Sequence, residues 1–439
     1  MNKIIGIGIG IALLGLATTH SSYATSAPAA EVKYLTYTEA VEIALRDNWD
    51  LLALRNQEES FKLRSKQALA PNNPVFSLSR NDTPGFSLTQ AAAQTSYALN
   101  WTLGFPGKSL TQSASTRHLG EATREQAISK EIDIITALSN NFISFSINQN
   151  FYQFLLEDQK RSKELMKLLE KKYSASQAAK VDLLNLEVVI QTTAQSILQN
   201  RNDYEILVTQ FRQIIRRPED KTLLPQIPTE IAIPKFSQSF EELVPLLLRN
   251  RHLLQASQKQ VESAQALLNN ARLQPFPDLQ LMGGINNWLP SGAPLSGILR
   301  DYSMSIGIAI PLFLPFNEIQ GMKAASHDLL AAENQLESQR LQAVSDLQTT
   351  FTSLNAAQKE LDGMVRLVVP AAKASYDLTL MTYSLGKADY FVLNQSRQSW
   401  VSSEKDLLTK RQSVAQLYNQ LIAQVGCDIT KTEGPHACQ

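Results

Sequence analysis

The residues best suited to chemistry are few and scattered along the 439-residue sequence. The five histidines follow neither metal-ligand spacing nor the arrangement of a catalytic triad. The segment GIGIG at 6–10 resembles a phosphate-binding loop, but it follows no strand and lies in an expected leader. The sequence therefore predicts no enzyme, no cofactor and no metal site. The histidines are His20, His118, His252, His327 and His436.

The two cysteines, Cys427 and Cys438, both lie near the C-terminus. In an oxidising compartment they could close a small disulfide loop, and we predict that they do. The alternative is a pair of free thiols on a frayed end. His436 lies beside them, but two cysteines and one histidine are too few ligands to indicate a zinc site.

The N-terminus is typical of an exported protein. Lys3 precedes an apolar run at 4–16, and a polar stretch then ends in SYA at 22–24, so a signal peptide 1–24 is expected. The run is too short to span a bilayer as a helix, and no cysteine nearby could carry a lipid. We expect a bacterial envelope protein. With 41 basic and 41 acidic residues, the chain has no charge signature for nucleic acid.

The remaining sequence reads as two copies of one unit. Residues 36–53 align with 239–256, and the same offset of 203 residues places Pro74 on Pro277. Four prolines mark the connection as a linker. The expected parts are a first repeat 25–215, a Pro-rich equatorial linker 216–239, a second repeat 240–426 and a tail 427–439.

Each repeat is predicted to contain a helix, two strands, a very long helix and another helix. The long helix at 108–172 would extend roughly 98 Å at 1.5 Å per residue. Two short helices placed end to end would match this length, and we expect 181–215 to continue into 240–273, and 390–425 to flank the second long helix together with 36–69. The helices are expected at 37–69, 108–172, 181–215, 240–273, 317–382 and 390–425.

Apolar residues at three-four spacing predict coiled-coil packing of these helices. One stripe runs from Leu183 to Ile214 and is interrupted by Thr193 and Asn200. Pro370 is expected to kink the second long helix, because proline removes a backbone donor.

The predicted strands alternate between large apolar and small or polar residues. A strand of a soluble sandwich would do the same, but these segments approach the length of a tilted membrane strand. Four strands cannot close alone in lipid, two chains would give a filled eight-stranded barrel, and three would give twelve strands around a passage. The residues expected to face lipid are Tyr97, Leu99, Trp101, Leu103, Tyr302, Ile306 and Ile308; Trp288 is a further interfacial aromatic.

Several motifs, taken in order, resemble TolC-type outer-membrane efflux proteins, closest to the cation-efflux branch with CzcC and CusC. They are LTYTEAVEIALRDNWDLLALR, ALAPNNPVFSLS, NWTLGFPGK and YSLGKADYFVLNQSR. The resemblance implies an α+β membrane protein in which a long α-helical coiled-coil barrel in the periplasm continues into a transmembrane antiparallel β-barrel. It also implies a homotrimer, a periplasmic adaptor protein and an inner-membrane pump of RND or ABC type.

The turns at 173–182 and 383–389 are the predicted gate, farthest from the barrel. Ordinary helical hairpins, with Gly386 as a cap, are the alternative. Ser176 replaces the glycine usual in the family, and Val392 takes a usual acidic position. By resemblance the second hairpin moves. The gate residues predicted are Tyr383, Gly386, Lys387, Asp389, Tyr173, Lys180 and Asp182.

The expected function is passive conduction through the outer membrane, from a pump and adaptor to the exterior, with metal cations or drugs as substrates. An outer-membrane component of a type I protein secretion system would have the same fold. A structural coiled coil of the envelope is a third reading, and it predicts no ion conductance.

Overall fold

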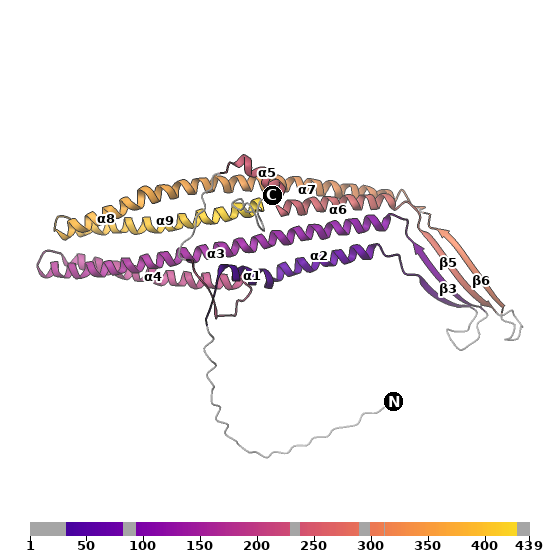
Figure 1. The fold of residues 1–439 in the computed structure, drawn as a ribbon, viewed down its shortest axis with the longest axis horizontal. Helices are drawn as coiled ribbons and strands as arrows, with labels where there is room; N and C mark the ends of the chain where they lie inside the picture. Colours follow the sequence, from indigo (N-terminus) through magenta and orange to yellow (C-terminus); the bar gives the residue numbers. More distant parts are fainter. Residues whose placement is uncertain (1–31, 82–93, 229–237, 289–298, 311, 428–439) are drawn as a thin grey trace, which may run out of the picture.

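A computed structural model describes residues 32–81, 94–228, 238–288, 299–310 and 312–427. The helices lie side by side along the long axis, and the strands extend from one end (Figure 1). The elements are β1 (Lys33–Leu35), α1 (Tyr37–Asp47), α2 (Trp49–Ala68), β2 (Val75–Asn81), β3 (Gln94–Leu103), α3 (Lys108–Ser174), α4 (Lys180–Ile214), β4 (Leu223–Pro225), α5 (Phe240–Asn250), α6 (His252–Leu273), β5 (Leu279–Trp288), β6 (Leu299–Ile308), α7 (Glu318–Gly363), the π-helix η2 (Met364–Val368), α8 (Val369–Ser384) and α9 (Tyr390–Val425).

The helices form four parallel lines, two of them made of short helices set end to end. The long helix α3 packs on one side against α4 followed by α1–α2, and on the other against α9 followed by α6 (Figure 1). The short helix α5 packs against α7 and the end of α9. The line α7–η2–α8 packs against α6 and α9. Among the helices described, none combines the length and apolar character that crossing a membrane requires.

The expected end-to-end partners were wrong: α4 meets α1 rather than α5, and α9 meets α5 rather than α1. Buried Val208 and Phe211 of α4 share one core with Ala40 and Ala44 of α1. The reason lies near the middle of the helical part, here called the equator. There β4, which follows α4, pairs in parallel with β1, which precedes α1. This two-stranded ladder holds the end of α4 against the start of α1.

The helices expected at 37–69 and 240–273 are each broken once, at positions related by the 203-residue offset. Asn48 ends α1 and caps α2, accepting hydrogen bonds from the amides of Asp50 (3.0 Å) and Leu51 (3.1 Å). Arg251 separates α5 from α6. Gly426 ends α9 at this second break with a φ of 83°, and a Cβ there would lie 2.5 Å from the carbonyl oxygen of Asn250. Glycine is therefore required on both counts.

Pro370 acts on the ladder of hydrogen bonds just before it. The five residues of η2 form one π-helical segment, and α8 begins with Val369 and Pro370. A wider turn accommodates a residue that cannot donate a backbone hydrogen bond and whose ring crowds the preceding turn.

Four strands form one antiparallel sheet in the order β2-β3-β5-β6. Residues directly opposite each other in such a ladder lie on the same face. Leu99 is opposite Phe76 and Gly283, and Gly283 is opposite Met304. The strand residues predicted to face lipid thus share one face, which also carries Leu78, Phe76, Leu279, Leu281 and Ile285. The opposite face carries mainly small and polar residues.

A polar joint fixes the strands to the helices. The Oδ1 atom of Asp278, which precedes β5, accepts hydrogen bonds from the amide of Phe105 (2.8 Å) and from Nζ of Lys108 (2.8 Å). Lys108 also donates to the carbonyl oxygen of Phe276 (2.9 Å), whose ring stacks on that of Phe105. The start of α3 is therefore tied to the start of β5.

The equator should be sensitive to acid through Asp47. Hydrogen bonds from Arg46 and Arg217 lower the pKa of its carboxyl to about 2, from about 4 in an unfolded chain. Because the folded pKa is the lower one, this stabilisation is present above pH 4 and is lost as the pH falls through 2. Asp47→Asn should flatten the stability–pH curve in this window, measured by urea unfolding followed by circular dichroism. The exposed Asp328→Asn should leave the curve unchanged.

Candidate functional site

The two hairpin turns lie at the end of the molecule opposite the strands (Figure 1). In the first, α3 ends and Ser176 adopts a φ of 59°, with the amide of Gln177 bonded to the carbonyl of Lys172 (2.8 Å). In the second, Gly386 adopts a φ of 74°, and the amide of Lys387 bonds to the carbonyl of Thr382 (2.9 Å). Both turns therefore close in the same way, with a left-handed residue after the helix.

The acidic residues of the predicted gate cap the helices that follow. Asp389 is the N-cap of α9 and accepts a hydrogen bond from the amide of Phe391 (3.3 Å). Asp182 lies in the first turn of α4 and accepts one from the amide of Ala179 (3.3 Å). Exposed Lys180 and Lys387 form no ion pair with the described residues. Within one chain, these charges therefore belong to two capped hairpins.

The predicted tyrosines lie in different environments. Tyr173 is exposed, whereas Tyr383 is buried and forms an edge-to-face contact with buried Tyr390. The hydroxyl oxygens of Tyr383 and Tyr390 have no hydrogen-bond partner among the described residues. Burial raises the pKa of both, that of Tyr390 to about 12. The two hydroxyls are neutral donors left available beneath the turns.

Lys172 joins the first hairpin to the second. Its Nζ atom donates to the carbonyl oxygen of Tyr383 (2.5 Å) and lies 4.6 Å from the centre of the Tyr383 ring. An ammonium group over an aromatic face is attracted by the ring as well as by the carbonyl. Sequence reasoning named Tyr383 but missed this contact.

A buried ion pair that lies further from the two turns, between α3 and α9, was also not predicted from the sequence. Arg397 of α9 donates through Nε to Oδ1 of Asp158 on α3 (3.0 Å), and its Nη2 contacts Oδ2 of the same carboxylate and Oγ1 of Thr193 on α4 (3.0 Å). All three side chains are buried, Asp158 to 2% exposure. This pair, here called the Asp158–Arg397 lock, connects three helices.

Aromatic rings surround the lock. Trp400 stacks on Tyr376 at 5.2 Å between ring centres and meets Phe154 edge-on at 5.3 Å. The guanidinium of Arg161 lies 4.8 Å from the Trp400 ring. The one sequence signal for the lock was the break in the apolar stripe at Thr193. The second break, Asn200, donates to the carbonyl of Asn148, which donates back to the carbonyl of Asn200 (3.3 and 3.0 Å).

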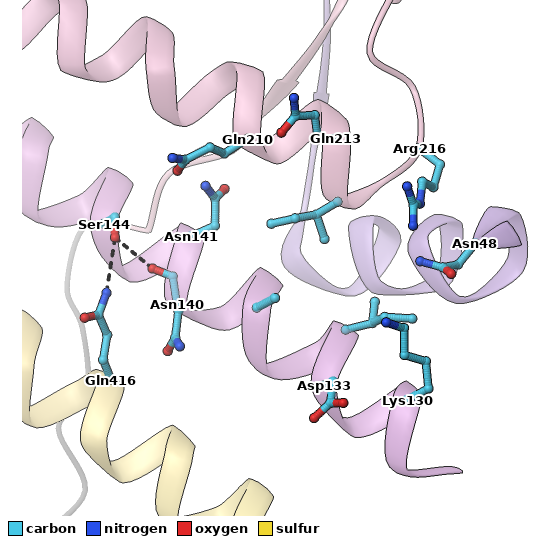
Figure 2. A pocket seen from close by; sticks show the side chains of 13 residues that line it. Asn48, Lys130, Asp133, Asn140, Asn141, Ser144, Gln210, Gln213, Arg216 and Gln416 are labelled. Atoms are coloured by element: carbon cyan, nitrogen blue, oxygen red, sulfur yellow. Dashed lines mark hydrogen bonds between the residues drawn. The ribbon is translucent and has the colours of Figure 1, made fainter. Parts of the chain in front are cut away.

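A cavity of 610 Å³ opens at the equator (Figure 2). Ser144 in its wall donates to the carbonyl of Asn140 and receives a hydrogen bond from Gln416. Its described lining contains neither histidine nor cysteine, and six of the 13 lining residues are amides. The lining residues labelled are Asn48, Lys130, Asp133, Asn140, Asn141, Ser144, Gln210, Gln213, Arg216 and Gln416.

Residues 243–427 match the sequence profile of the family described as "Outer membrane efflux protein". The second half of the chain thus resembles the outer membrane efflux protein family. This match indicates an outer-membrane transport protein rather than an enzyme. A curated relative, nodulation protein T of Rhizobium leguminosarum bv. trifolii, is 21% identical over 339 residues, which is 75% of this chain and 70% of that protein.

Solved outer-membrane and channel proteins share the fold. The OprN channel superposes with a TM-score of 0.74 at 20% identity, covering 89% of each chain. CusC gives a TM-score of 0.74 at 17% identity, over 90% of this chain and 93% of CusC. VceC of Vibrio cholerae gives 0.73 at 17% identity, over 89% of this chain and 96% of VceC. The resemblance to TolC-type proteins in the sequence is confirmed, and these structures show the fold without separating its branches.

A left-handed residue other than glycine gives a direct test of the first turn. Ser176→Gly should raise the free energy of unfolding by about 1 kcal/mol, because glycine adopts positive φ without a Cβ penalty. Ser174→Gly, two residues earlier within α3, should lower it by about 0.5–1 kcal/mol. Guanidinium unfolding of the two variants measures both changes, and equal signs would contradict the assignment of the turn.

The expected signal peptide and Cys438 both lie outside the described residues. Cys427 is 5% exposed and packs in the core shared by α5, α7 and α9. The disulfide between the two cysteines stays a prediction.

Proposed function

We propose that three copies of this chain form the outer-membrane channel of a tripartite efflux system. A periplasmic adaptor and an inner-membrane pump would deliver metal cations or drugs to it. The observation that carries the proposal is the four-stranded sheet: it has one apolar face and continues directly into long helices. In lipid, strands need a partner on both sides and an apolar outer face.

The edges of the sheet support closure between chains. Among the described residues, β2 and β6 each have a neighbouring strand on one side only. In the proposal, β6 of one chain pairs with β2 of the next, so that three chains close a barrel of twelve strands. Twelve strands leave space for a passage, whereas eight would be filled by side chains. The two structural repeats of the sequence would then alternate around the ring.

The helical part has two apolar edges that suit the same ring. On the α2–α4 edge, Trp49 and Leu198 are exposed, and on the α7–α8 edge, Leu341 and Leu367 are exposed. Different edges that meet in a closed ring form a heterologous interface, as threefold symmetry requires. Burial of these residues against the neighbouring chain would remove apolar surface from water.

The gate is proposed at the two hairpin turns, here called the tips of the helical part. Three copies of each hairpin would converge there. Opening would move α8–α9 away from α3–α4, which separates Lys172 from Tyr383 and Arg397 from Asp158. Breaking a buried ion pair costs several kcal/mol, so the closed state is favoured until adaptor binding supplies the difference. The free hydroxyls of Tyr383 and Tyr390 would find partners only in the assembled or moving tip.

Purification and conductance test the function directly. The mature protein should require detergent, run as a trimer after cross-linking, and conduct ions in a planar bilayer. A protein with the same helices but only a structural role in the envelope would give no conductance. A water-soluble monomer without conductance would contradict both the barrel and the channel.

The charges of the second hairpin give a specific prediction. Asn is as good an N-cap as Asp, so Asp389→Asn removes the charge and keeps the start of α9. Combined with Lys387→Gln, it should raise single-channel conductance and weaken cation preference, and Asp182→Asn should do less. Unchanged conductance and selectivity in the double variant would leave these residues with a purely structural role.

A further inference from the structure

Three metal-ligating side chains meet at the seam between α3 and α6. His118 and Glu121 lie one turn apart on α3, and Glu262 reaches them from α6. The Nδ1 atom of His118 is 3.2 Å from Oε2 of Glu121 and 3.2 Å from Oε2 of Glu262. The three side chains are partly buried, so they are held in place and still reachable from solvent.

The spacing of these atoms suits a metal ion. Two ligand atoms about 2.1 Å from zinc, at a tetrahedral angle, lie about 3.4 Å apart. The two distances from His118 Nδ1 are within a few tenths of this separation, and all three ligand atoms lie within 4.8 Å of one another. Small changes in the carboxylate rotamers would therefore complete three ligands and leave a fourth position for water.

Two buried serines join α3 to α6 beside the cluster. Ser115, one turn before His118, shares a hydrogen bond of 2.9 Å with Ser263, which follows Glu262. Ser263 also donates to the carbonyl of Ser115 (3.0 Å), and both serines are buried. These contacts hold the two helices close together and fix Glu262 opposite His118.

The ammonium group of Lys259 lies against the carboxylates where a bound cation would be expected. Its Nζ atom lies 2.8 Å from Oε2 of Glu262 and 3.2 Å from Oε2 of Glu121, the same oxygens that face His118. These contacts place one ammonium group between the two carboxylates that would bind the ion. The lysine side chain is 34% exposed, so its ammonium can leave toward solvent.

We propose that His118, Glu121 and Glu262 form a binding site for a divalent transition-metal ion of the zinc type, with Lys259 as a built-in competitor. One imidazole nitrogen and two carboxylate oxygens are ligands for Zn²⁺ rather than for Cu⁺, which prefers thiolate or thioether sulfur. The nitrogen ligand argues against Mg²⁺ and Ca²⁺, which prefer oxygen. A bound ion would connect the two halves of one chain in the part of the helices nearer the strands.

Zinc titration of the full mature chain in detergent tests the site, in a background with His436→Gln, Cys427→Ser and Cys438→Ser so that the tail offers neither an imidazole nor a thiol. The background protein should bind one Zn²⁺ per chain. His118→Gln, and separately Glu262→Gln, should weaken this binding at least about tenfold, because each removes a ligand. Lys259→Gln should strengthen it about tenfold by removing the competing ammonium. His327→Gln, on exposed α7 surface, is the matched control.

Cobalt spectroscopy gives a second measurement. Co²⁺ in this site should show ligand-field bands without thiolate charge transfer, and these bands should disappear in Glu262→Gln. Circular dichroism and cross-linking establish that each variant is folded and assembled. Absence of zinc binding, or binding that is equal in His118→Gln and His327→Gln, would show that the cluster is an ion-pair network only.

Discussion

Arg397→Met is expected to lower the free energy of unfolding by about 3–5 kcal/mol, since it leaves the buried carboxylate of Asp158 without its partner. Asp158 is 2% exposed, so water cannot replace the two lost contacts from the guanidinium. Thr193 alone offers one long hydrogen bond of 3.5 Å. Guanidinium unfolding at one fixed protein concentration, followed by the fluorescence of nearby Trp400, measures the change.

A double variant separates the value of the lock from the penalty of breaking it. Arg397→Met with Asp158→Leu should recover most of the lost stability, because no buried charge is then left alone. Arg340→Met, which removes an exposed ion pair with Glu337, should cost less than about 1 kcal/mol. If Arg397→Met cost no more than Arg340→Met, the lock would not be formed in the protein.

The lock also connects stability to the proposed gate. Arg397→Met removes the link between α9 and α3 without altering the turns, so a closed channel held by the lock should conduct more often in the variant. The unfolding experiment does not depend on the channel, and therefore a failure of one measurement leaves the other interpretable.

Leu99→Arg is the second large effect, expected to cost about 2–4 kcal/mol and to hinder assembly of the barrel. Leu99 lies mid-strand on the apolar face, opposite Phe76 and Gly283. In the proposed barrel this face meets lipid, where a guanidinium is poorly solvated. Ile308→Arg at the end of β6 should act in the same direction. Heat-resistant trimers on gels and the yield of protein in outer membranes measure assembly.

The neighbouring residue gives the matched control. Asn100 lies on the opposite face of β3, opposite Val75 and Met282. Asn100→Arg places the same side chain in the proposed lumen, where water is available, so the trimer should assemble and its conductance should change. Equal loss of assembly at 99 and 100 would contradict the assignment of the two faces.

The strands and long helices were predictable because each depends on a local pattern. Alternation in 97–105 gave β3 and its apolar face, and Pro74 and Pro277 marked where helices end before β2 and β5. The breaks at Asn48 and Arg251 were not predicted, because apolar periodicity continues across them. Asn48 is a strong N-cap, and reading it as one would have located the first break.

Contacts between residues far apart in the chain could not be predicted from local sequence patterns. Arg397 and Asp158 are separated by 239 positions, and each lies in an ordinary helical segment. The end-to-end partners were assigned by length alone, whereas the three-residue ladder of β1 and β4 decides them. The cluster of His118, Glu121 and Glu262 was not predicted for the same reason, since Glu262 comes from the second half of the chain.

The helices set end to end determine how the molecule can twist. Along two of its four lines the backbone does not continue across the equator: α4 only abuts α1, and α9 only abuts the break between α5 and α6. Of the two lines that do continue, α7–α8 contains the π-helical segment η2. Only α3 crosses as an unbroken α-helix. Torsion applied at the tips can therefore be absorbed by sliding at two non-covalent joints. The continuous helix α3 keeps the length along the axis constant.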